Sequence, residues 1–489
     1  MNNIKSYSLV SIMLLLFCTS CKKEWLNTAP TDQIDQSAVF STTSNAMIAL
    51  NGIHRRMWTQ YFNQDEAGQG SVQIYMDVLG EDLINNSTAT GAFYNQAYRW
   101  QAHRNANSSV PYFVYHFYYY IISSANALIN NIDKASGPES DKKIIKGQAL
   151  AYRAWAHFML VQLFGKRYDA AAKPNNQSGV PLMLTNTTTG QPRATVEEVY
   201  TQVNKDLDDA ITNLAGYNRP AKSHININVA KGIKARVALT MQDWANAAKF
   251  ASEARQGFTL MSKDQYLAGF NDASNPEWMW ASIVTTDQGT FFYSYFAYMS
   301  SNFSSNATRT NPRSINKNLY DAIPATDVRK QLWNPAGVTP PANGTKFPYT
   351  GTKFRVKDPT VSVGDVVYMR AAEMYLIEAE ANAWLSKNTE AQDLLLTLVK
   401  SRDPDYVKPT KTGQALIDEI SLQRRIELWG EGFRFLDLKR TNSPLDRTGA
   451  NHNAAIAVTL TVPAGDVQWE WLFPQDEINA NPAIVQNPL

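Results

Sequence analysis

Cysteine is nearly absent from this chain of 489 residues, which contains only Cys18 and Cys21. Both lie at the N-terminal end, so the rest of the chain has no thiol for a disulfide, a cysteine nucleophile or a thiolate metal site. Stability must therefore come from burial of a core. A chain of this length, folded as one large or two ordinary domains, buries roughly 70–75% of its unfolded surface.

A strong charge of either sign is also lacking, because 46 lysines and arginines offset 44 aspartates and glutamates for a net charge of +2. Nucleic-acid binding needs a clustered basic excess, so we expect no nucleic-acid partner. After the first residues, no apolar run approaches the ~20 residues that a transmembrane helix requires. Membrane attachment is therefore expected only at the N-terminal end.

Motifs for catalysis and metal binding are missing as well. The six histidines form no His-x-x-x-His pair, and neither a Gly-x-Ser-x-Gly elbow nor a phosphate-binding glycine loop occurs. We therefore expect no cofactor, no metal site and no catalytic residue, and we expect His157 to be packed. Acidic residues cluster twice, and we expect both clusters to lie mostly on solvent-facing helix surfaces rather than across a cleft. They are Asp206, Asp208 and Asp209, and Glu373, Glu378 and Glu380.

Residues 1–20 have the organisation of a secretory leader. A single lysine precedes an apolar stretch from Leu9 to Phe17, which is too short to cross a bilayer of about 30 Å, and two small residues follow. The next residue is Cys21, which predicts a lipoprotein whose mature chain begins at this lipid-modified cysteine, although Cys18 stands where leucine is usual. An ordinary secreted protein and a membrane anchor helix are the alternatives. Residues 21–40 are predicted to form a polar tether.

Apolar residues recur at spacings of three and four along much of the chain, which predicts a mainly α fold. Thr195 and Glu198 form a capping box, and Gly165 ends a long stripe. Small residues at the contact positions favour successive helical hairpins, in tetratricopeptide-like repeats with large insertions. An unrelated all-helical globule is the alternative. The main stripes cover residues 121–132, 145–163, 196–214, 229–241, 247–251, 372–383 and 391–398.

The pattern changes between residues 259 and 365, where proline, glycine, asparagine, serine and threonine dominate and aromatic residues crowd together. A loop-rich segment of this length inside a compact protein is usually functional. We therefore divide the mature chain into an N-terminal helical part (41–258), an irregular ligand-facing segment (259–365) and a C-terminal helical part (366–489). Within the irregular segment, Trp278 and Trp280 are predicted to be structural.

Aromatic residues make up 11% of the chain, and many stand among asparagine, glutamine, serine and arginine. A flat ring covers the apolar face of a sugar or a peptide side chain with little loss of rotamer entropy, and nearby amides can bond its polar groups. Packing in the core is the alternative for each ring. The predicted ligand-binding residues are Tyr75, Trp100, Asn107, Tyr293, Tyr295 and Tyr298.

Several motifs resemble those of one known family. They are KKEWLNTAP at 22–30, the helix at 147–165, the segment 230–244, MRAAEMYLIEAEA at 369–381, RRIELWGEGFRFLDLKR at 424–440, and the ending at 473–488. In this order they resemble the SusD/RagB family of outer-membrane nutrient-binding lipoproteins from Bacteroidetes. The motifs span nearly the whole mature chain.

The resemblance implies an α-helical fold on about four tetratricopeptide-like units, displayed on the outer membrane and facing the cell exterior. It also implies a SusC-like TonB-dependent transporter as partner, and non-catalytic capture of nutrients, usually glycans and sometimes peptides. Glu427, Arg434 and Asp437 fall in the matched motifs, where we expect them to join the C-terminal helices to the frame. Peptide uptake, a surface glycosidase and a protein-interaction scaffold are the alternatives.

Overall fold

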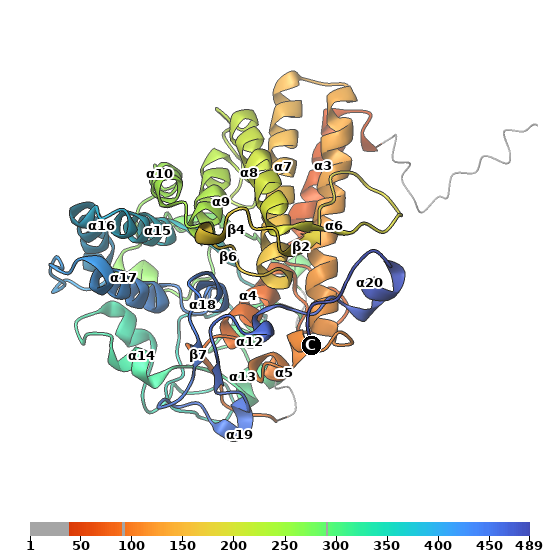
Figure 1. Cartoon of the computed structure of the whole chain (residues 1–489). Coiled ribbons are helices and arrows are strands. Elements are labelled where there is room, and N and C mark those ends of the chain that lie inside the picture. The colour runs from red at the N-terminus through yellow and green to blue at the C-terminus, as the bar shows by residue number, and fades with distance from the viewer. Residues whose placement is uncertain (1–38, 90–92, 290–291) are drawn as a thin grey trace, which may run out of the picture.

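The computed structural model describes residues 39–89, 93–289 and 292–489 (Figure 1). Cys21 and nearly all of the predicted tether lie outside these ranges. Helices dominate the described chain, which confirms the prediction of a mainly α fold. Among the described residues, we find no helix with the length and apolar character needed to cross a membrane.

Long helices occupy the stretches that show helical periodicity. α7 ends at Phe164, directly before Gly165, and the side chains of Thr195 and Glu198 form the predicted capping box at the start of α8. Local sequence therefore sets the ends of these helices. The longer helices are α3 (Thr43–Arg56), α4 (Gly68–Val78), α6 (Ser109–Asn131), α7 (Glu139–Phe164), α8 (Val196–Asn213), α9 (Ile227–Thr240), α10 (Trp244–Ala254), α15 (Ala371–Trp384), α16 (Asn388–Lys400), α17 (Gly413–Glu427) and α18 (Arg434–Arg440).

Successive long helices pack on one another as hairpins. α6 packs on α7, α7 on α8, α9 on α10, and α15 on α16, while α10 packs on α15 and so joins the two groups. The connections between α6 and α7, α9 and α10, and α15 and α16 are short, which favours antiparallel neighbours, whereas β2 (Ser178–Pro181) and β3 (Arg193–Thr195) lie in the long connection between α7 and α8. Figure 1 shows the helices as an arc that runs from α3 and α6 through α10 to α16 and α17. The predicted helical-hairpin repeats are thereby confirmed.

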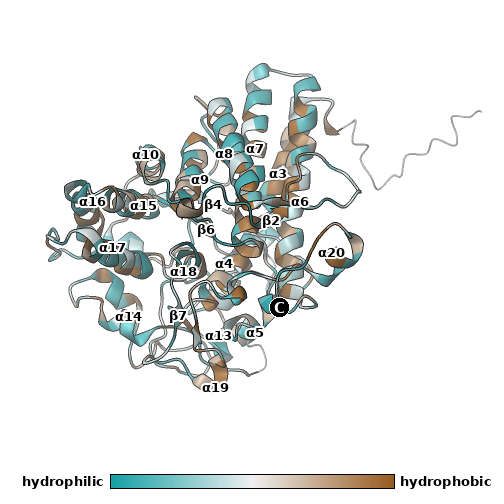
Figure 2. Ribbon diagram, in the orientation of Figure 1, coloured by the Kyte–Doolittle hydropathy of each residue, from teal (hydrophilic) through white to brown (hydrophobic). Residues whose placement is uncertain are grey.

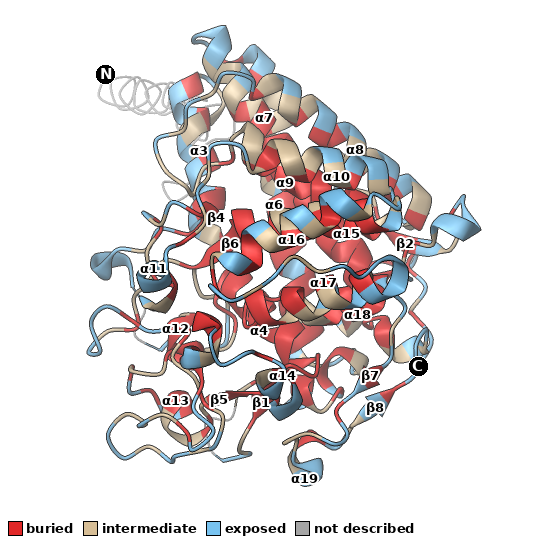
Figure 3. Ribbon diagram, turned by 90° about the vertical axis from the view of Figure 1, so that its left-hand side faces the viewer, coloured by how far each residue is buried: buried red, intermediate tan, exposed pale blue. Residues whose placement is uncertain are grey.

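The helices are amphipathic around a continuous core. Figure 2 shows hydrophilic residues on the outer faces of the arc, and Figure 3 shows that those faces are exposed. All residues of α4 are buried, because this helix lies inside the arc and packs on α18. The arc therefore holds α4 and α18 at the centre of the molecule (Figure 1).

Residues 259–365 form short elements, and the loop-rich character predicted for this segment is observed. Trp278 and Trp280 are buried, as predicted. The short helices of the described chain are α5 (Asn95–Tyr98), α11 (Lys263–Leu267), α12 (Phe296–Met299), α13 (Asn306–Thr310), α14 (Lys317–Asp321), α19 (Ala454–Ala457) and α20 (Gln475–Ala480). The strands form antiparallel pairs: β1 (Leu83–Asn85) with β5 (Arg313–Ile315), β2 (Ser178–Pro181) with β3 (Arg193–Thr195), β4 (Trp278–Ala281) with β6 (Val367–Arg370), and β7 (Leu445–Asp446) with β8 (Thr461–Val462).

A buried ionic network joins the irregular segment to the C-terminal helices. Glu427, at the end of α17, accepts hydrogen bonds from Arg370 Nη1 at 2.6 Å and from Arg402 Nη2 at 3.0 Å. Arg329 Nη1 is a third donor at 3.1 Å. Burial acts to raise the pKa of Glu427, but the three arginines outweigh burial and hold the pKa well below its ordinary value. The structural role expected for Glu427 is confirmed.

The acidic clusters correct one expectation. Three of their carboxylates are buried and face arginines on other elements, because the packing of neighbouring helices covers that side. Only Asp208 and Asp209 keep largely exposed side chains. The buried pairs are Asp206 with Arg153, Glu373 with Arg236 and Glu380 with Arg440, at N–O distances of 2.7, 2.7 and 2.6 Å.

Candidate functional site

The structure buries four of the six predicted ligand-binding residues. Tyr75, Trp100, Tyr295 and Tyr298 are each at most 4% exposed. Trp100 packs edge-on against Trp469 at 4.8 Å between ring centroids and donates Nε1–H to the Leu79 carbonyl at 2.9 Å. The expectation of open stacking platforms is therefore revised for these rings, because segments distant in the sequence cover them.

Tyr295 is held in the core by its polar end. Its hydroxyl donates to the Gly430 carbonyl at 2.6 Å, and its ring packs edge-on against Phe354 at 5.1 Å. Asn107 is exposed in the loop before α6, where its backbone N–H donates to the Asn105 side chain at 3.0 Å. Among the described residues, no hydrogen bond or ring contact joins Trp100 or Asn107 to the predicted tyrosines.

Two of the predicted tyrosines meet in an aromatic cluster, which we define as Tyr75, Phe93, Tyr94 and Tyr298. Tyr94 lies 4.7 Å from Tyr75 and 5.2 Å from Tyr298, between ring centroids, and Phe93 lies 5.3 Å from Tyr298. The rings come from α4, the loop before α5, and α12. Phe93 is only partly buried, and Tyr293, which precedes α12, is also partly buried. The cluster therefore reaches the surface through Phe93.

Phe93 and Tyr94 are not among the residues that the sequence predicts to bind a ligand. Their only local signal is a pair of aromatic residues in a polar, glycine-containing stretch, which is weak. The structure adds that Tyr94 has a φ of 71°, in the left-handed region that residues other than glycine rarely adopt. Such backbone strain persists where the surroundings impose it and is common at ligand-binding sites.

Polar groups line the aromatic cluster. The Tyr75 hydroxyl donates to Asp65 Oδ2 at 3.0 Å, and the Tyr94 hydroxyl donates to Ser71 Oγ at 3.0 Å. Burial raises the pKa of Asp65, and the hydrogen bond from Tyr75 opposes this rise. The Arg313 guanidinium lies 5.7 Å from the centroid of the Tyr94 ring. The cluster thus combines ring surface with hydrogen-bonding groups.

Two buried polar atoms at the cluster have no hydrogen-bond partner within the part of the chain that the structure describes. They are the Tyr298 hydroxyl and Nε of Arg313, whose guanidinium lies near the Tyr94 ring. Leaving one such atom unpaired costs about 1–3 kcal/mol, so folded proteins rarely tolerate several in one place. Tyr298 and Arg313 also line a narrow hollow of about 20 Å³ together with Ser300 and Thr308. The Tyr298 hydroxyl and Arg313 Nε therefore keep unused hydrogen-bonding capacity beside this hollow.

The described residues contain no cluster of three or more histidine, cysteine, aspartate or glutamate side chains arranged to hold a metal ion. His157 is fully buried, and its Nε2 accepts a hydrogen bond from the Met183 N–H at 3.2 Å. The packed role predicted for His157 is therefore confirmed.

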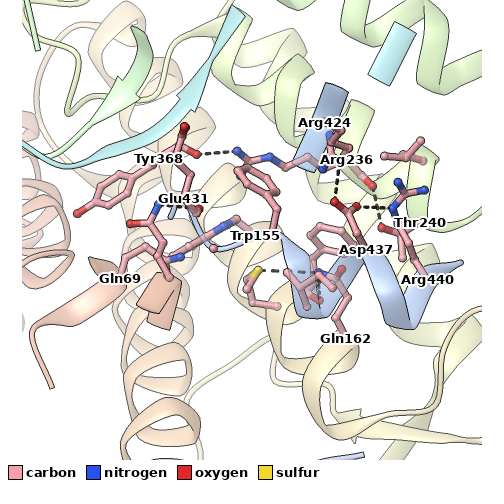
Figure 4. A pocket seen from close by; sticks show the side chains of 17 residues that line it. Gln69, Trp155, Gln162, Arg236, Thr240, Tyr368, Arg424, Glu431, Asp437 and Arg440 are labelled. Carbon is pink, nitrogen blue, oxygen red and sulfur yellow. Dashed lines mark hydrogen bonds and ion pairs between the residues drawn. The ribbon is translucent and has the colours of Figure 1, made fainter. Parts of the chain in front are cut away.

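A second pocket, at the centre of the molecule, belongs to the frame (Figure 4). It is small, with a volume of about 60 Å³. Figure 4 shows Asp437 between Arg424 and Arg440, and the Nε atom of each arginine donates to it at 2.7 Å. Arg434 Nε similarly donates to Glu81 at 2.8 Å. These pairs fix α18 against its neighbours, which confirms the structural roles expected for Arg434 and Asp437.

We expect acid to weaken the fold through Asp437. Burial acts to raise the pKa of this carboxyl, but Arg424 and Arg440 outweigh burial and lower the pKa to about 2 from an ordinary value of 3.8. Because the pKa is lower in the folded chain, the stabilisation is complete above the unfolded pKa and is lost as the pH falls toward 2. At neutral pH the contribution is about 2 kcal/mol.

Urea unfolding of the wild type and of Asp437→Asn, followed from about pH 7 to about pH 2.5, measures this contribution. The variant should be less stable than the wild type at neutral pH. The difference in unfolding free energy should shrink on acidification, because protonation removes the contribution of Asp437 while the other carboxyls titrate alike in both proteins. A difference that does not change with pH would contradict the assignment.

The frame of packed helical hairpins around a continuous core places the chain in the class of helical-repeat proteins. Two family models match the chain and together cover most of it. The model described as "Starch-binding associating with outer membrane" matches residues 42–239, and the model described as "SusD family" matches residues 251–489. The chain belongs to the SusD/RagB family.

Solved structures share the fold over nearly the whole chain. A SusD-like carbohydrate binding protein from Bacteroides vulgatus is 25% identical, with a TM-score of 0.79 over 91% of this chain and 97% of that chain. A SusD superfamily protein from Bacteroides thetaiotaomicron is 25% identical, with a TM-score of 0.78 over 92% and 100%. The SusD-like protein P38 of Formosa agariphila is 33% identical over 100 residues, a match that spans 19% of this chain and 20% of that protein.

Proposed function

We propose that this protein binds glycans, without catalysis, at the aromatic cluster of Tyr75, Phe93, Tyr94 and Tyr298. The observation that carries the proposal is the unpaired Tyr298 hydroxyl and Arg313 Nε beside the partly exposed ring of Phe93. A sugar presents an apolar C–H face to a ring and hydroxyl groups that both donate and accept hydrogen bonds. The Tyr298 hydroxyl and Arg313 Nε can bond such hydroxyls, while Phe93 and Tyr293 cover the apolar face.

Named relatives support this ligand class. One structural neighbour is a carbohydrate binding protein, and another, 22% identical with a TM-score of 0.70, is a laminarin-binding SusD-like protein. The family model for the N-terminal half carries starch in its description. Peptide capture and glycoside hydrolysis are the alternatives. Release of reducing ends from a bound glycan would favour hydrolysis, and saturable binding of peptides in place of glycans would favour peptide capture.

We further propose that the protein acts at the cell surface. Cys21 would carry a lipid that anchors the protein in the outer membrane, facing the exterior, with residues 21–40 as its tether. There it would pass captured glycan to a SusC-like TonB-dependent transporter. Anchoring beside the transporter raises the effective concentration of glycan at the pore, so moderate affinity suffices. Mass spectrometry of the mature protein tests the lipid at Cys21, and co-purification from membranes tests the transporter.

Tyr298→Phe separates ligand binding from stability. The variant loses only a hydroxyl that has no partner among the described residues, so its melting temperature should not fall. Its affinity for the bound glycan should fall about tenfold if that hydroxyl bonds the ligand. Isothermal titration with laminarihexaose and maltohexaose, together with thermal unfolding, measures both effects.

Tyr295→Phe is the matched control. Its hydroxyl already donates to the Gly430 carbonyl, so the change should destabilise the protein by about 1 kcal/mol and leave glycan affinity unchanged. If Tyr298→Phe binds glycan as tightly as the wild type, the aromatic cluster is not the binding site.

A further inference from the structure

Two tryptophans form a stacked pair between the neighbouring helices α10 and α15. Trp244 begins α10 and Trp384 ends α15, and their rings lie 5.2 Å apart between centroids at an interplanar angle of 9°. Trp384 is 46% exposed. An indole ring this open to water gives up hydrophobic stabilisation that a buried position would provide. Its rigid, flat surface is suited to contact a ligand.

The tryptophan pair borders a hollow of about 460 Å³, which we call the tryptophan hollow. Its other walls come from α17 and α18, so its lining belongs to elements separate from the aromatic cluster. The volume falls in the range of small-molecule sites. Gln414, Asp418 and Thr441 are polar lining residues exposed to solvent.

An ionic chain forms the floor of the tryptophan hollow. Glu380, one helical turn before Trp384 on α15, pairs with Arg440 at 2.6 Å. Arg440 in turn pairs with Asp437 at 2.7 Å, and Asp437 pairs with Arg424 at 2.7 Å. The floor is therefore fixed in position by charge-assisted hydrogen bonds.

One donor on this floor is left unpaired. Arg424 is 5% exposed, and its Nη1 atom has no hydrogen-bond partner among the residues that the structure describes. Arg424 lines both the tryptophan hollow and the interior pocket of Figure 4. A buried guanidinium N–H without an acceptor is costly, so a ligand oxygen that reached Arg424 Nη1 would form a strong, charge-assisted hydrogen bond.

The charges around the hollow indicate the chemistry of its ligand. The lining holds three carboxylates and three guanidinium groups, so it has no excess charge to attract an ion. Glu380, Asp437 and Asp418 are the carboxylates, and Arg424, Arg434 and Arg440 the guanidinium groups. A flat apolar wall, a neutral balance and an unpaired donor suit a neutral, hydroxyl-rich ligand with one apolar face.

We propose that the tryptophan hollow is a second saccharide site, where a sugar ring stacks on Trp384 and a sugar hydroxyl accepts a hydrogen bond from Arg424 Nη1. This inference rests on the proposed glycan-binding function. A protein with two such sites holds one glycan chain at two points, or two chains at once, and therefore gains avidity for polysaccharides over short oligosaccharides.

Isothermal titration and tryptophan fluorescence with laminarihexaose and maltohexaose test the second site. The mature wild-type protein should bind two hexasaccharides, and filling of one site should change the tryptophan emission. Trp384→Ala should weaken that site about tenfold or more, whereas Trp384→Phe should keep most of the affinity and lose the emission change. Tyr298→Phe should weaken only the other site.

Tyr120→Ala is the matched control, because Tyr120 is 45% exposed on another helix and should leave both sites intact. One bound hexasaccharide in the wild type, with unchanged affinity in Trp384→Ala, would overturn the second site and leave the proposed function standing. No binding of either sugar would overturn the proposed function itself. Loss of transporter binding in Trp384→Ala, with glycan stoichiometry unchanged, would instead make the hollow a protein interface and overturn the saccharide assignment.

Discussion

Replacing Glu427 by glutamine is expected to lower the free energy of unfolding by about 3–5 kcal/mol, as when one partner of a buried ion pair is removed. The change keeps the shape of the side chain but removes the negative charge that Arg329, Arg370 and Arg402 share. Glu427 and all three arginines are at most 1% exposed, so water cannot replace the lost charge. Urea unfolding measures the loss.

Asp321→Asn is the control for Glu427→Gln. Asp321 pairs with Lys317 on the surface of α14, with 50% of the Asp321 side chain exposed. An exposed pair of this kind contributes about 0–1 kcal/mol, so the control should unfold nearly as the wild type does. Similar losses in both variants would mean that the buried network does not stabilise the fold as we describe.

Gly432→Ala is the second large expected effect, with a loss of about 2–4 kcal/mol from backbone strain and overpacking. Gly432 has a φ of +87°, and a Cβ atom there would lie 2.6 Å from Gln73 Cα. Its N–H donates to Asp77 Oδ2 at 2.8 Å, which holds the turn before α18 against α4. Neither backbone can move without breaking this contact, so the clash cannot be relieved cheaply.

Gly216→Ala is the control that separates backbone strain from overpacking. Gly216 has a similar φ of +76°, but a Cβ atom there would meet nothing within 4 Å. This variant should lose only the conformational part, about 1 kcal/mol. Thermal unfolding of both variants gives the comparison, and equal losses would show that the contact with Gln73 is unimportant.

Sequence reasoning predicted the helical frame because helices depend on local information. The apolar spacing within α7, the capping box of α8 and Gly165 after α7 all act within a few residues of chain. These signals can be identified in the sequence even when the elements that pack against the helix are unknown. For the same reason, the loss of periodicity after residue 258 predicted the irregular segment correctly.

The binding residues could not be predicted equally well. Tyr295 and Tyr293 stand two positions apart in the same polar stretch, yet one is buried against Phe354 and the other is partly exposed. Nothing local distinguishes them, because Phe354 and the turn after α17 come from far along the chain to cover Tyr295. Phe93 enters the aromatic cluster only because α12 packs beside its loop, roughly 200 residues later.

Local sequence therefore determines where helices begin and end, which faces are apolar, and to which family the chain belongs. Tertiary structure alone decides which carboxylates are paired and which rings reach the surface. Glu427 lies 98 residues from Arg329, and its burial depends on the whole arc closing around them. A buried charge or an exposed ring is a property of two distant segments together, and neither segment encodes it separately.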